Sequence, residues 1–465
     1  MPHLRPTTVS LVALVAVVTC PHTTAHAAPK EKVLFSFGLL EGGQNVTGAV
    51  PNGGLILDAS GNLYGTTGLG GNACNAGGIV FELIPRANGT WREKILHNFP
   101  CSSADGSDPN GNLIFDSAGN LYGTTACGGR YAAFCSGYGG TVFQLTPTKD
   151  GHWKERILHS FGHDRDGEAP SGGLVSDADG NLCGTTVTGG IYGVNCDGVC
   201  GGTVFELSQG KNGHWTEKVL HNFKGSIHNY FKDGFGPYGP LAIDASGNLY
   251  GTTAQGGPHT CYNAYGCGLA FELSPNQDGR WSYKAIRAFD GRDGYVPGPL
   301  ILDAAGNLYG TTAFGGAKGC TYDYKTGCGT AFELVPGADG KWTENVLHPF
   351  YKPREPEGGF VTGGLTFDAA GNLYGTSWAG GAYFDGNEYC VELCGGTVFE
   401  LHSGADGRWL VTNLHNFGAP GTDDANDPAG SLVFDASGNL YGASQFGGDQ
   451  CSDIGGCGTV FEITP

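Results

Sequence analysis

The sequence contains little positive charge. Its 465 residues include 25 lysines and arginines against 44 aspartates and glutamates, and the formal net charge is −19. A nucleic-acid-binding surface needs clustered lysines and arginines that displace phosphate counterions, and an anionic membrane attracts the same side chains. No basic cluster is longer than the KEK that begins at Lys30. We therefore expect neither nucleic acid nor an anionic membrane surface as a partner.

Long apolar runs are missing after the N-terminus. The run from Val9 to Val18 is too short, at about ten residues, to span a bilayer as a helix. Arg5 precedes this run and Ala25-His26-Ala27 follows it as a small-x-small cleavage site, which is typical of a secretory signal peptide. We predict a signal peptide at residues 1–27, no transmembrane segment, and a periplasmic or extracellular location.

A lipoprotein is the alternative interpretation of the same segment. Cys20 would then carry the lipid. Thr19, however, is a poor residue before a lipidated cysteine, so we favour ordinary cleavage.

Charged side chains and helical patterns are scarce as well. Only 15% of the residues are charged, whereas 84 are glycine and 40% are hydrophobic. This combination favours tight turns between short strands over charged amphipathic helices. The hydrophobic fraction is near the range of globular proteins, which argues against disorder. Because no stretch after the signal shows a helical period with caps, we expect an all-β protein.

Repetition is abundant. The pattern D-x-x-G-N-L occurs in seven copies spaced 58 to 67 residues apart, which begin at Asp58, Asp116, Asp177, Asp244, Asp303, Asp368 and Asp435. Each copy carries four strand-like pieces, rich in Val, Ile, Phe, Tyr and Thr and bounded by turn residues. Examples are Gly53–Asp58, Asn62–Thr67, Gly202–Leu207 and Trp153–Phe161. Four strands per unit, repeated radially, indicate a β-propeller.

The two ends of the repeat region predict a closed ring. The fourth piece is missing from the seventh unit, but Lys32–Phe37 (KVLFSF) matches the fourth piece Lys218–Phe223 (KVLHNF). A ring locked by a divided unit leaves no exposed edge strand, whereas an open solenoid has no reason to divide one. We predict that residues 28–465 form one seven-bladed β-propeller domain of four-stranded blades. Residues 32–37 would complete the blade that contains residues 430–463.

The connections divide between two faces. First-to-second and third-to-fourth connections lie on one face, which we call the lower face; the others lie on the upper face. The repeated turn sequence is on the lower face, where Asp58 can accept backbone N–H bonds and Gly61 can adopt a left-handed conformation. The upper loops are longer and carry most cysteines and many aromatic residues, so we expect a ligand there.

These linked motifs resemble a known repeat family. The unit LHNF…DG…P…GGLI.DA.GNLYGTT..GG…GTVFEL is similar to the GloVer (Gloeo/Verruco) tandem repeat of exported bacterial proteins, from Lys32 to Pro465. The resemblance implies an exported bacterial protein with a propeller-like fold and implies little about activity. The D..GNLYGT portion is also similar, more loosely, to the repeats of two-component-regulator propellers. A shared fold does not carry a shared function.

The cysteines favour disulfides, because an exported protein meets oxidising conditions. Of 16 cysteines, twelve form close pairs in second-to-third loops: Cys127/Cys135, Cys196/Cys200, Cys261/Cys267, Cys320/Cys328, Cys390/Cys394 and Cys451/Cys457. We also pair Cys74 with Cys101, which lie in upper loops that follow one another. Cys183 replaces the tyrosine of the NLYG motif, and we expect a buried free thiol.

Metal patterns are weak. A structural zinc site needs about four converging ligands, but the cysteine pairs belong to separate blades. The DRDG at Asp164 and the DADGN at Asp177 resemble the start of a calcium loop. The twelfth residue from Asp177 is Thr188, however, where such a loop needs a bidentate glutamate. We expect no metal and no cofactor, with calcium as the alternative.

Catalytic motifs are missing too: no GxSxG, HExxH or P-loop pattern occurs. Histidine recurs in the motif LHxF, at His97, His159, His221, His348 and His415. A catalytic base is usually unique, because one geometry serves one site. We therefore assign no catalytic residue and interpret these histidines as repeated packing or hydrogen-bonding groups.

Aromatic residues outside the repeat are better candidates for a site. Trp378 is the one tryptophan outside the fourth strands, and it begins an upper loop. Candidates for ligand binding on the upper loops are Trp378, Tyr383, Asp385, Tyr389, Tyr322 and Tyr262. Rings beside carboxylates and amides could stack on sugar rings and bind hydroxyls. The alternative is that these rings only pack the loops.

We expect a secreted, monomeric binding or interaction module whose ligand is a glycan, a peptide or an envelope protein. One alternative is a carbohydrate-active enzyme, a lyase or hydrolase, with its site at the mouth of the central channel. Another is a purely structural surface protein. Two or three acids outside the repeat with a histidine or tyrosine at the channel mouth would favour the enzyme. A mouth lined by repeated residues and aromatic rings would favour binding.

Overall fold

The computed structural model describes the greater part of the chain. The described residues are 29–38, 47–71, 77–100, 104–131, 139–193, 201–225, 233–261, 265–316, 321–322, 325–351, 358–361, 363–383, 395–419, 422, 424–448 and 457–464. Their regular elements are β-strands. In this part of the chain, no helix has the length and hydropathy needed to cross a membrane.

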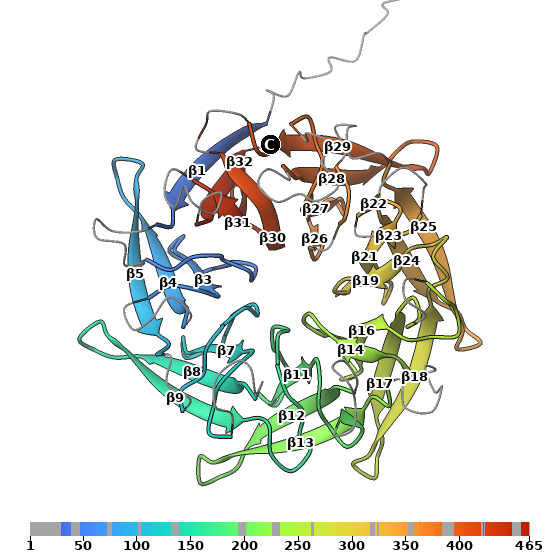
Figure 1. The fold of residues 1–465 in the computed structure, drawn as a ribbon, viewed down its shortest axis with the longest axis horizontal. Coiled ribbons are helices and arrows are strands. Elements are labelled where there is room, and N and C mark those ends of the chain that lie inside the picture. Colours follow the sequence, from blue (N-terminus) through green and yellow to red (C-terminus); the bar gives the residue numbers. More distant parts are fainter. Residues whose placement is uncertain are drawn as a thin grey trace, which may run out of the picture.

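Seven antiparallel sheets are arranged radially around a central axis, which confirms the predicted seven-bladed propeller (Figure 1). The first, innermost strands are β2 (Ile56–Leu57), β6 (Ile114–Phe115), β10 (Val175–Ser176), β15 (Ala242–Ile243), β20 (Ile301–Leu302), β26 (Thr366–Phe367) and β30 (Ala425–Phe434). The second strands are β3 (Leu63–Thr67), β7 (Leu121–Thr125), β11 (Leu182–Thr186), β16 (Leu249–Gln255), β21 (Leu308–Phe314), β27 (Leu373–Ser377) and β31 (Leu440–Gly447).

The outer half of each blade holds the longer strands. The third strands are β4 (Ile79–Pro85), β8 (Thr141–Pro147), β12 (Thr203–Gln209), β17 (Leu269–Pro275), β24 (Thr330–Pro336), β28 (Thr397–Ser403) and β32 (Thr459–Thr464). The fourth strands are β5 (Trp91–Asn98), β9 (Trp153–Ser160), β13 (Trp215–Asn222), β18 (Trp281–Ala288), β25 (Trp342–Pro349), β29 (Trp409–Asn416) and β1 (Lys30–Ser36). Additional short strands are β14 (Phe235–Pro237), β19 (Tyr295–Pro297), β22 (Thr321–Tyr322) and β23 (Lys325–Thr326). We number the blades 1 to 7 from β2 onward.

The repeated lower turn is held by its own aspartate. In blade 1, Asp58 Oδ1 accepts hydrogen bonds from the backbone N–H groups of Ser60 and Asn62, at 2.8 and 2.9 Å. Asp58 Oδ2 accepts bonds from the Asn62 side-chain amide and from the hydroxyl of Tyr64. Gly61 has a φ of 83°, the left-handed conformation expected for it. The motif is therefore turn chemistry, as predicted.

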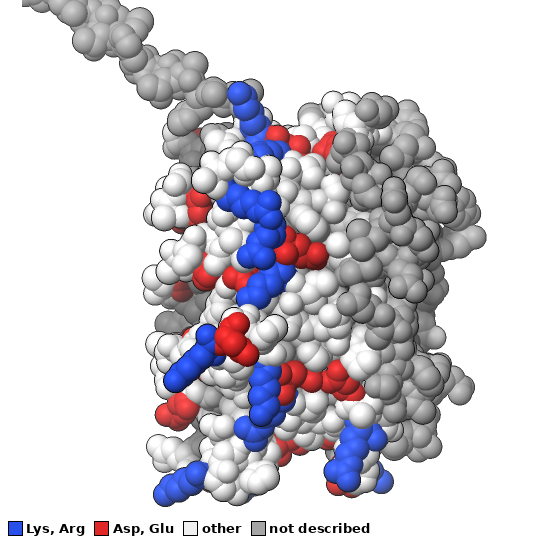
Figure 2. Space-filling model, turned by 90° about the vertical axis from the view of Figure 1, so that its left-hand side faces the viewer, with Lys and Arg blue, Asp and Glu red and all other residues white. Residues whose placement is uncertain are grey.

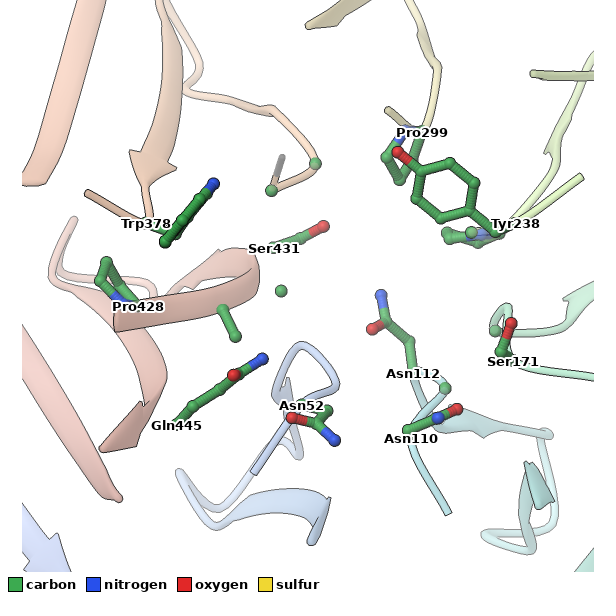
Figure 3. Close-up of a pocket in the computed structure, with 18 of the residues that line it drawn as sticks. Asn52, Asn110, Asn112, Ser171, Tyr238, Pro299, Trp378, Pro428, Ser431 and Gln445 are labelled. Atoms are coloured by element: carbon green, nitrogen blue, oxygen red, sulfur yellow. The ribbon is translucent and has the colours of Figure 1, made fainter. Parts of the chain in front are cut away.

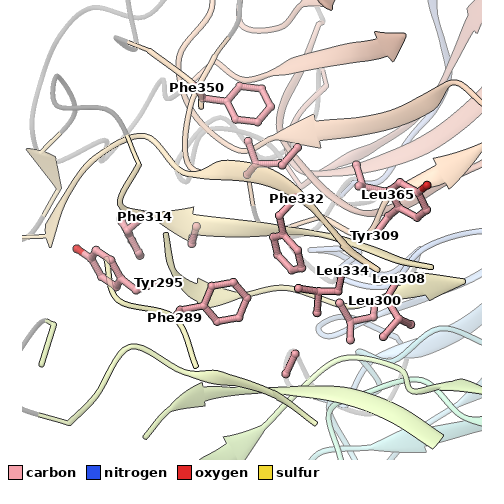
Figure 4. Close-up of a cluster of buried hydrophobic side chains, with 14 of the residues drawn as sticks. Phe289, Tyr295, Leu300, Leu308, Tyr309, Phe314, Phe332, Leu334, Phe350 and Leu365 are labelled. Carbon is pink, nitrogen blue, oxygen red and sulfur yellow. The ribbon is translucent and has the colours of Figure 1, made fainter. Parts of the chain in front are cut away.

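A phenylalanine contact joins each blade to the next. The phenylalanine of the LHxF motif packs against the phenylalanine of the GTVFEL motif in the following blade, with ring centroids 4.8–5.3 Å apart at all seven junctions. The pairs are Phe37/Phe81, Phe99/Phe143, Phe161/Phe205, Phe223/Phe271, Phe289/Phe332, Phe350/Phe399 and Phe417/Phe461. Figure 4 shows Phe289 and Phe332 within the hydrophobic cluster around blade 5. Such aromatic pairs contribute about 0.5–1.5 kcal/mol each beyond the burial of their area.

The glycine of the NLYGT motif makes room for this contact. A Cβ on Gly65 would lie 2.7 Å from Cζ of Phe81, and the equivalent distance in the other six blades is 2.4–2.7 Å. The repeated tryptophans also pack between blades, as Trp153 does against Tyr64 of the preceding blade. Glycine, phenylalanine and tryptophan recur in the repeat because the side chains at each junction pack in the same way.

The N-terminal strand closes the ring as predicted. β1 pairs antiparallel with β32, with Lys32 opposite Glu462, and the N–H of Phe37 donates to the carbonyl of Gly458. Phe37 is fully buried and contacts Phe81 of blade 1. Blade 7 thus combines β30, β31 and β32 with β1 from the other end of the sequence.

Charged side chains lie where the fourth strands of adjacent blades meet, which we call the rim junctions. Four junctions combine a histidine or arginine at the histidine position of LHxF, the aspartate of the following loop and a glutamate from the next blade: His97/Asp105/Glu155, His159/Asp166/Glu217, Arg287/Asp293/Glu344 and His415/Asp424/Glu31. At the junction of blades 3 and 4, Tyr283 replaces the glutamate and stacks on His221 at 4.2 Å. The repeated histidines therefore have the packing and hydrogen-bonding role expected from their repetition.

Lysines and arginines on the outside of the ring also bridge blades. Figure 2 shows these side chains in a row along the side of the ring, with acidic side chains beside them. Lys32 Nζ donates to the carbonyl of Gly89, and Lys218 Nζ to that of Gly279, each in the following blade. Exposed charge contacts of this kind each contribute little to stability, about 0–1 kcal/mol.

Removal of β1 should open the ring. A variant that begins at residue 38 loses the β1/β32 pairing and the buried Phe37, whose burial alone contributes about 3 kcal/mol. We expect its free energy of unfolding to fall by several kcal/mol, and we expect self-association through the exposed edge of β32. A variant that begins at residue 29 keeps β1 and is the control. Equal melting temperatures for the two variants would contradict the closure.

Glu93 should make stability depend on pH. It takes the rim position in blade 1, its Oε1 is buried without a hydrogen-bond partner among the described residues, and burial raises its pKa to about 8. The folded protein therefore keeps Glu93 protonated at pH values where the unfolded chain has released the proton. Stability from this group is full below about pH 4.5 and is lost as the pH rises to about 8.

Substitution of Glu93 by glutamine should remove this loss. We expect Glu93→Gln to unfold at a melting temperature at least about 2 °C higher than the native chain at pH 8.5, and at a similar one at pH 4.5. Thermal unfolding followed by circular dichroism at both pH values measures this. An equal effect at the two pH values would show that the carboxyl group does not titrate as described.

Candidate functional site

The inner end of each blade has an unusual backbone conformation. At seven equivalent positions the chain enters the first strand through a residue with φ between 54 and 61°: Val50, Asp108, Ala169, Gly236, Val296, Phe360 and Asp427. This left-handed region is strained for side chains other than glycine. A proline follows in six of the seven blades. The residue after the proline then lines the central channel in several blades, as Asn52, Asn110, Ser171 and Tyr238 do.

Hydrogen bonds between blades fix the channel wall. The first hydroxyl residue of the GTT motif donates to a glycine carbonyl on the inner segment of the next blade, with oxygen–oxygen distances of 3.0–3.5 Å. These bonds are Thr66–Gly111, Thr124–Gly172, Thr185–Gly239, Thr252–Gly298 and Thr311–Gly363. The Asn112 Oδ1 atom also accepts the N–H of Gly54 at 2.6 Å. The inner segments are thus held by their neighbours as well as by their own blade.

A cavity of about 390 Å³ lies in this channel (Figure 3). Side chains from different blades surround it, with Trp378 and Gln445 on one side and Tyr238 on the other. The remaining polar side chains come from the inner segments: Asn52, Asn110, Asn112, Ser171, Asp427 and Ser431. Trp378 packs against Phe360, with ring centroids 5.4 Å apart, so the position of its indole is fixed.

The cavity contains polar groups but carries little charge. Among the described residues that line it, Asp427 is the single ionisable carboxylate, and neither histidine, lysine nor arginine is present. Burial raises the pKa of Tyr238 to about 12, so its hydroxyl stays protonated at neutral pH. The Asn110 Oδ1 atom is buried and has no hydrogen-bond partner within the described part of the protein. The polar side chains of the cavity are therefore mainly amides and hydroxyls, which can both donate and accept hydrogen bonds.

The repeats match a family model across the chain. The model of the Gloeobacter/Verrucomicrobia repeat matches residues 27–196, 191–402 and 262–465. The chain belongs to this repeat family. The GloVer resemblance seen in the sequence is therefore confirmed. No curated protein matches this GloVer-repeat protein.

Solved structures resemble the GloVer-repeat protein in fold alone. A fungal alcohol oxidase of the AA5 family, in complex with copper, is 15% identical, with a TM-score of 0.52 over 94% of this chain and 77% of that one. A luciferin-regenerating enzyme is 12% identical over 76% of this chain and 91% of its own, with a TM-score of 0.39. A hypothetical selenium-binding protein from Sulfolobus tokodaii is 12% identical over 76% and 74%, with a TM-score of 0.46.

The predicted ligand-binding residues of the GloVer-repeat protein separate in the structure. Trp378 lines the central cavity, whereas Tyr383 has 45% of its surface exposed and is not among the residues that line the cavity. Tyr322 ends the short strand β22. Three further candidates, Asp385, Tyr389 and Tyr262, lie outside the described residues. Among the predicted residues that the structure describes, Trp378 is therefore the one that lines the same cavity as the amide and hydroxyl side chains.

The predicted disulfides can be followed in part. Cys261 and Cys267 form a disulfide, as their close pairing predicts. Cys127, Cys328 and Cys457 are also disulfide-bonded. Their proposed partners lie outside the described residues, together with both members of three other proposed pairs: Cys135, Cys320, Cys451, Cys74, Cys101, Cys196, Cys200, Cys390 and Cys394. Cys183 is a buried free thiol, and burial raises its pKa far above the usual value.

Several cavity residues were missed because they lie inside the repeat. Asn52, Asn110 and Tyr238 follow the repeated proline, and their variety distinguishes them from the uniform residues around them. Gln445 was also missed; it occupies the position after the second strand's GTT-type motif, where blade 6 has the predicted Trp378 and blades 1, 2, 4 and 5 have glycine or alanine. Aligning the seven repeats and marking their variable positions would have found both sets.

Proposed function

We propose that this GloVer-repeat protein is an exported binding module that holds an uncharged, hydroxyl-rich ligand, a glycan, in its central cavity. The observation that supports this proposal is the combination of the fixed indole of Trp378 with amides and hydroxyls around one cavity. An aromatic face packs against the C–H face of a sugar ring, while amides exchange hydrogen bonds with its hydroxyls.

The cavity has a suitable size for such a ligand. Small-molecule pockets usually measure about 300–1,000 Å³ and combine apolar surface with a few placed polar groups. At about 390 Å³ this cavity lies at the lower end, which suits one or two sugar units. Trp378 and Tyr238 lie on opposite sides of it, so a ring can contact both (Figure 3). The Asn110 oxygen supplies an acceptor that needs a donor from the ligand.

The charge of the cavity favours binding over catalysis. Hydrolysis of a glycosidic bond generally uses a pair of carboxyl groups on either side of the bond. The described lining contains Asp427 as its one carboxylate and has no histidine. This is closer to the composition expected of a binding module than to that expected of a lyase or hydrolase at the channel mouth. A cavity that carries a fixed indole also gives less support to a purely structural role.

Binding should depend on Trp378. On a glycan array followed by titration calorimetry, we expect Trp378→Ala to weaken binding at least about 30-fold, as the loss of a central aromatic anchor costs roughly 2 kcal/mol or more. Tyr383→Ala is the matched control, because it removes an exposed aromatic side chain a few residues away, and we expect unchanged affinity. Circular dichroism checks that both variants fold.

Two outcomes would remove this proposal. One is that no glycan binds the native chain. The other is that Trp378→Ala leaves affinity unchanged while Tyr383→Ala lowers it, which would place the site on the exposed loops. A smaller loss in Asn52→Ala or Gln445→Ala, about 3- to 10-fold for one hydrogen bond, would locate the ligand in the channel more closely.

A further inference from the structure

Two rim junctions place three possible metal ligands close together. Between blades 1 and 2, His97 Nε2 lies 3.3 Å from Asp105 Oδ2 and 3.7 Å from Glu155 Oε2. Between blades 6 and 7, His415 Nε2 lies 3.3 Å from Asp424 Oδ1, with Glu31 beside them. In each set, one donor atom per residue lies within 4.8 Å of the others.

These separations fit ligands of one ion. Zinc binds imidazole nitrogen at about 2.0–2.1 Å and carboxylate oxygen at about 2.0–2.2 Å, so two of its ligands lie roughly 3.0–3.5 Å apart. His159 and Asp166, at the junction of blades 2 and 3, are only 2.8 Å apart, as in a direct hydrogen bond. The 3.3 Å contacts of His97 and His415 are also within hydrogen-bonding range. These two junctions differ from the others in the described rim because all three donor atoms lie within 4.8 Å of one another.

The junction between blades 4 and 5 has a positive charge at the place that the histidine occupies in other junctions. Arg287 stands there in place of the histidine, and its guanidinium contacts the carboxylates of both Asp293 and Glu344. Two carboxylates thus enclose a permanent cation at an equivalent place in the same ring. Neutral histidine supplies no such charge, but it is a common ligand for a divalent cation.

The glutamates also have coordinating capacity left. Glu155 Oε1 and Glu31 Oε1 are buried and have no hydrogen-bond partner among the described residues. The rim glutamates Glu93, Glu217 and Glu344 share this feature, so it does not by itself identify a site. At these two junctions a histidine nitrogen and a second carboxylate also lie within 4.8 Å of the glutamate oxygen.

We propose that the junctions of blades 1/2 and 6/7 each bind one Zn²⁺ ion through a histidine, an aspartate and a glutamate, with water completing the coordination. Imidazole is a good ligand for zinc and a poor one for Ca²⁺ or Mg²⁺, which take oxygen. Each ion would join two blades, because the glutamate comes from the blade after the one that supplies the other two ligands. At the 6/7 junction that glutamate is Glu31 of β1, so zinc would fasten the strand that closes the ring.

Calorimetric titration of the tag-free, chelator-treated native chain with Zn²⁺ tests this. We expect two ions per chain and a higher melting temperature with zinc. His97→Arg and His415→Arg introduce the side chain that the chain itself uses at position 287, and each should lower the stoichiometry from two to one. The double variant should bind none. His159→Gln, at the junction of blades 2 and 3 where three donor atoms of the described residues do not converge within 4.8 Å, is the matched control and should still bind two.

Variants that replace the glutamate ligands test the proposal even if an arginine variant does not fold. Glu155→Gln and Glu31→Gln preserve side-chain shape and should each remove one ion. Co²⁺ in place of zinc gives an independent readout, since its visible absorption reports the ligand geometry and should fall by half in each single variant. The proposal is overturned if the native chain binds no ion at these sites, or if the arginine and glutamine variants of folded protein still bind two.

Discussion

The fold depends on one contact between neighbouring blades. The phenylalanine that follows each fourth strand meets a phenylalanine of the next third strand, and a glycine on the second strand leaves the space that this second side chain occupies. A methyl group at that glycine would collide with the ring in every blade. Since protein interiors are close-packed, the glycine and the two phenylalanines constrain one another. The repeat preserves this set while much of the surrounding sequence varies.

The arrangement of the blades could be predicted because it is encoded locally. Each lower turn contains its own aspartate acceptor and its own left-handed glycine, as Asp58 and Gly61 illustrate. Such turns can be counted along the sequence, and the count is the number of blades. The division of one unit between the two ends then predicts that the ring closes, because residues 32–37 match a fourth strand and can supply the one that the seventh unit lacks.

The sites could not be predicted in the same way, because their residues come together only after the ring has formed. The cavity combines Trp378 with Asn52 and Tyr238, which belong to three blades far apart in sequence. A rim junction joins His97 to Glu155 across a blade boundary. In the sequence, the histidine and the aspartate of the junction belong to separate motifs, and the glutamate is one residue of a strand in the next repeat. Nothing in the sequence indicates that the three lie together. Closeness to Trp378 in the sequence, by contrast, did not predict which residues line the cavity, since Tyr383 does not line it.

The central and peripheral parts of the ring differ in their electrostatics. The polar side chains that line the cavity are mainly neutral amides and hydroxyls, whereas the rim encloses carboxylates with histidine or arginine between them. The centre is therefore suited to hydrogen bonding with a neutral molecule, and the rim to holding cations that connect blades.

The pairing of β1 with β32 has a consequence for how such a protein can evolve. All seven junctions use the same aromatic contact, and the blade that holds the two chain ends has four strands like the others. The termini could therefore lie in any of the seven blades without a change in the fold. A gene shifted by one whole repeat would encode the same circle with its opening in a different blade. Duplication, loss and permutation of repeats can therefore change the order of the variable side chains around the axis while the architecture stays the same.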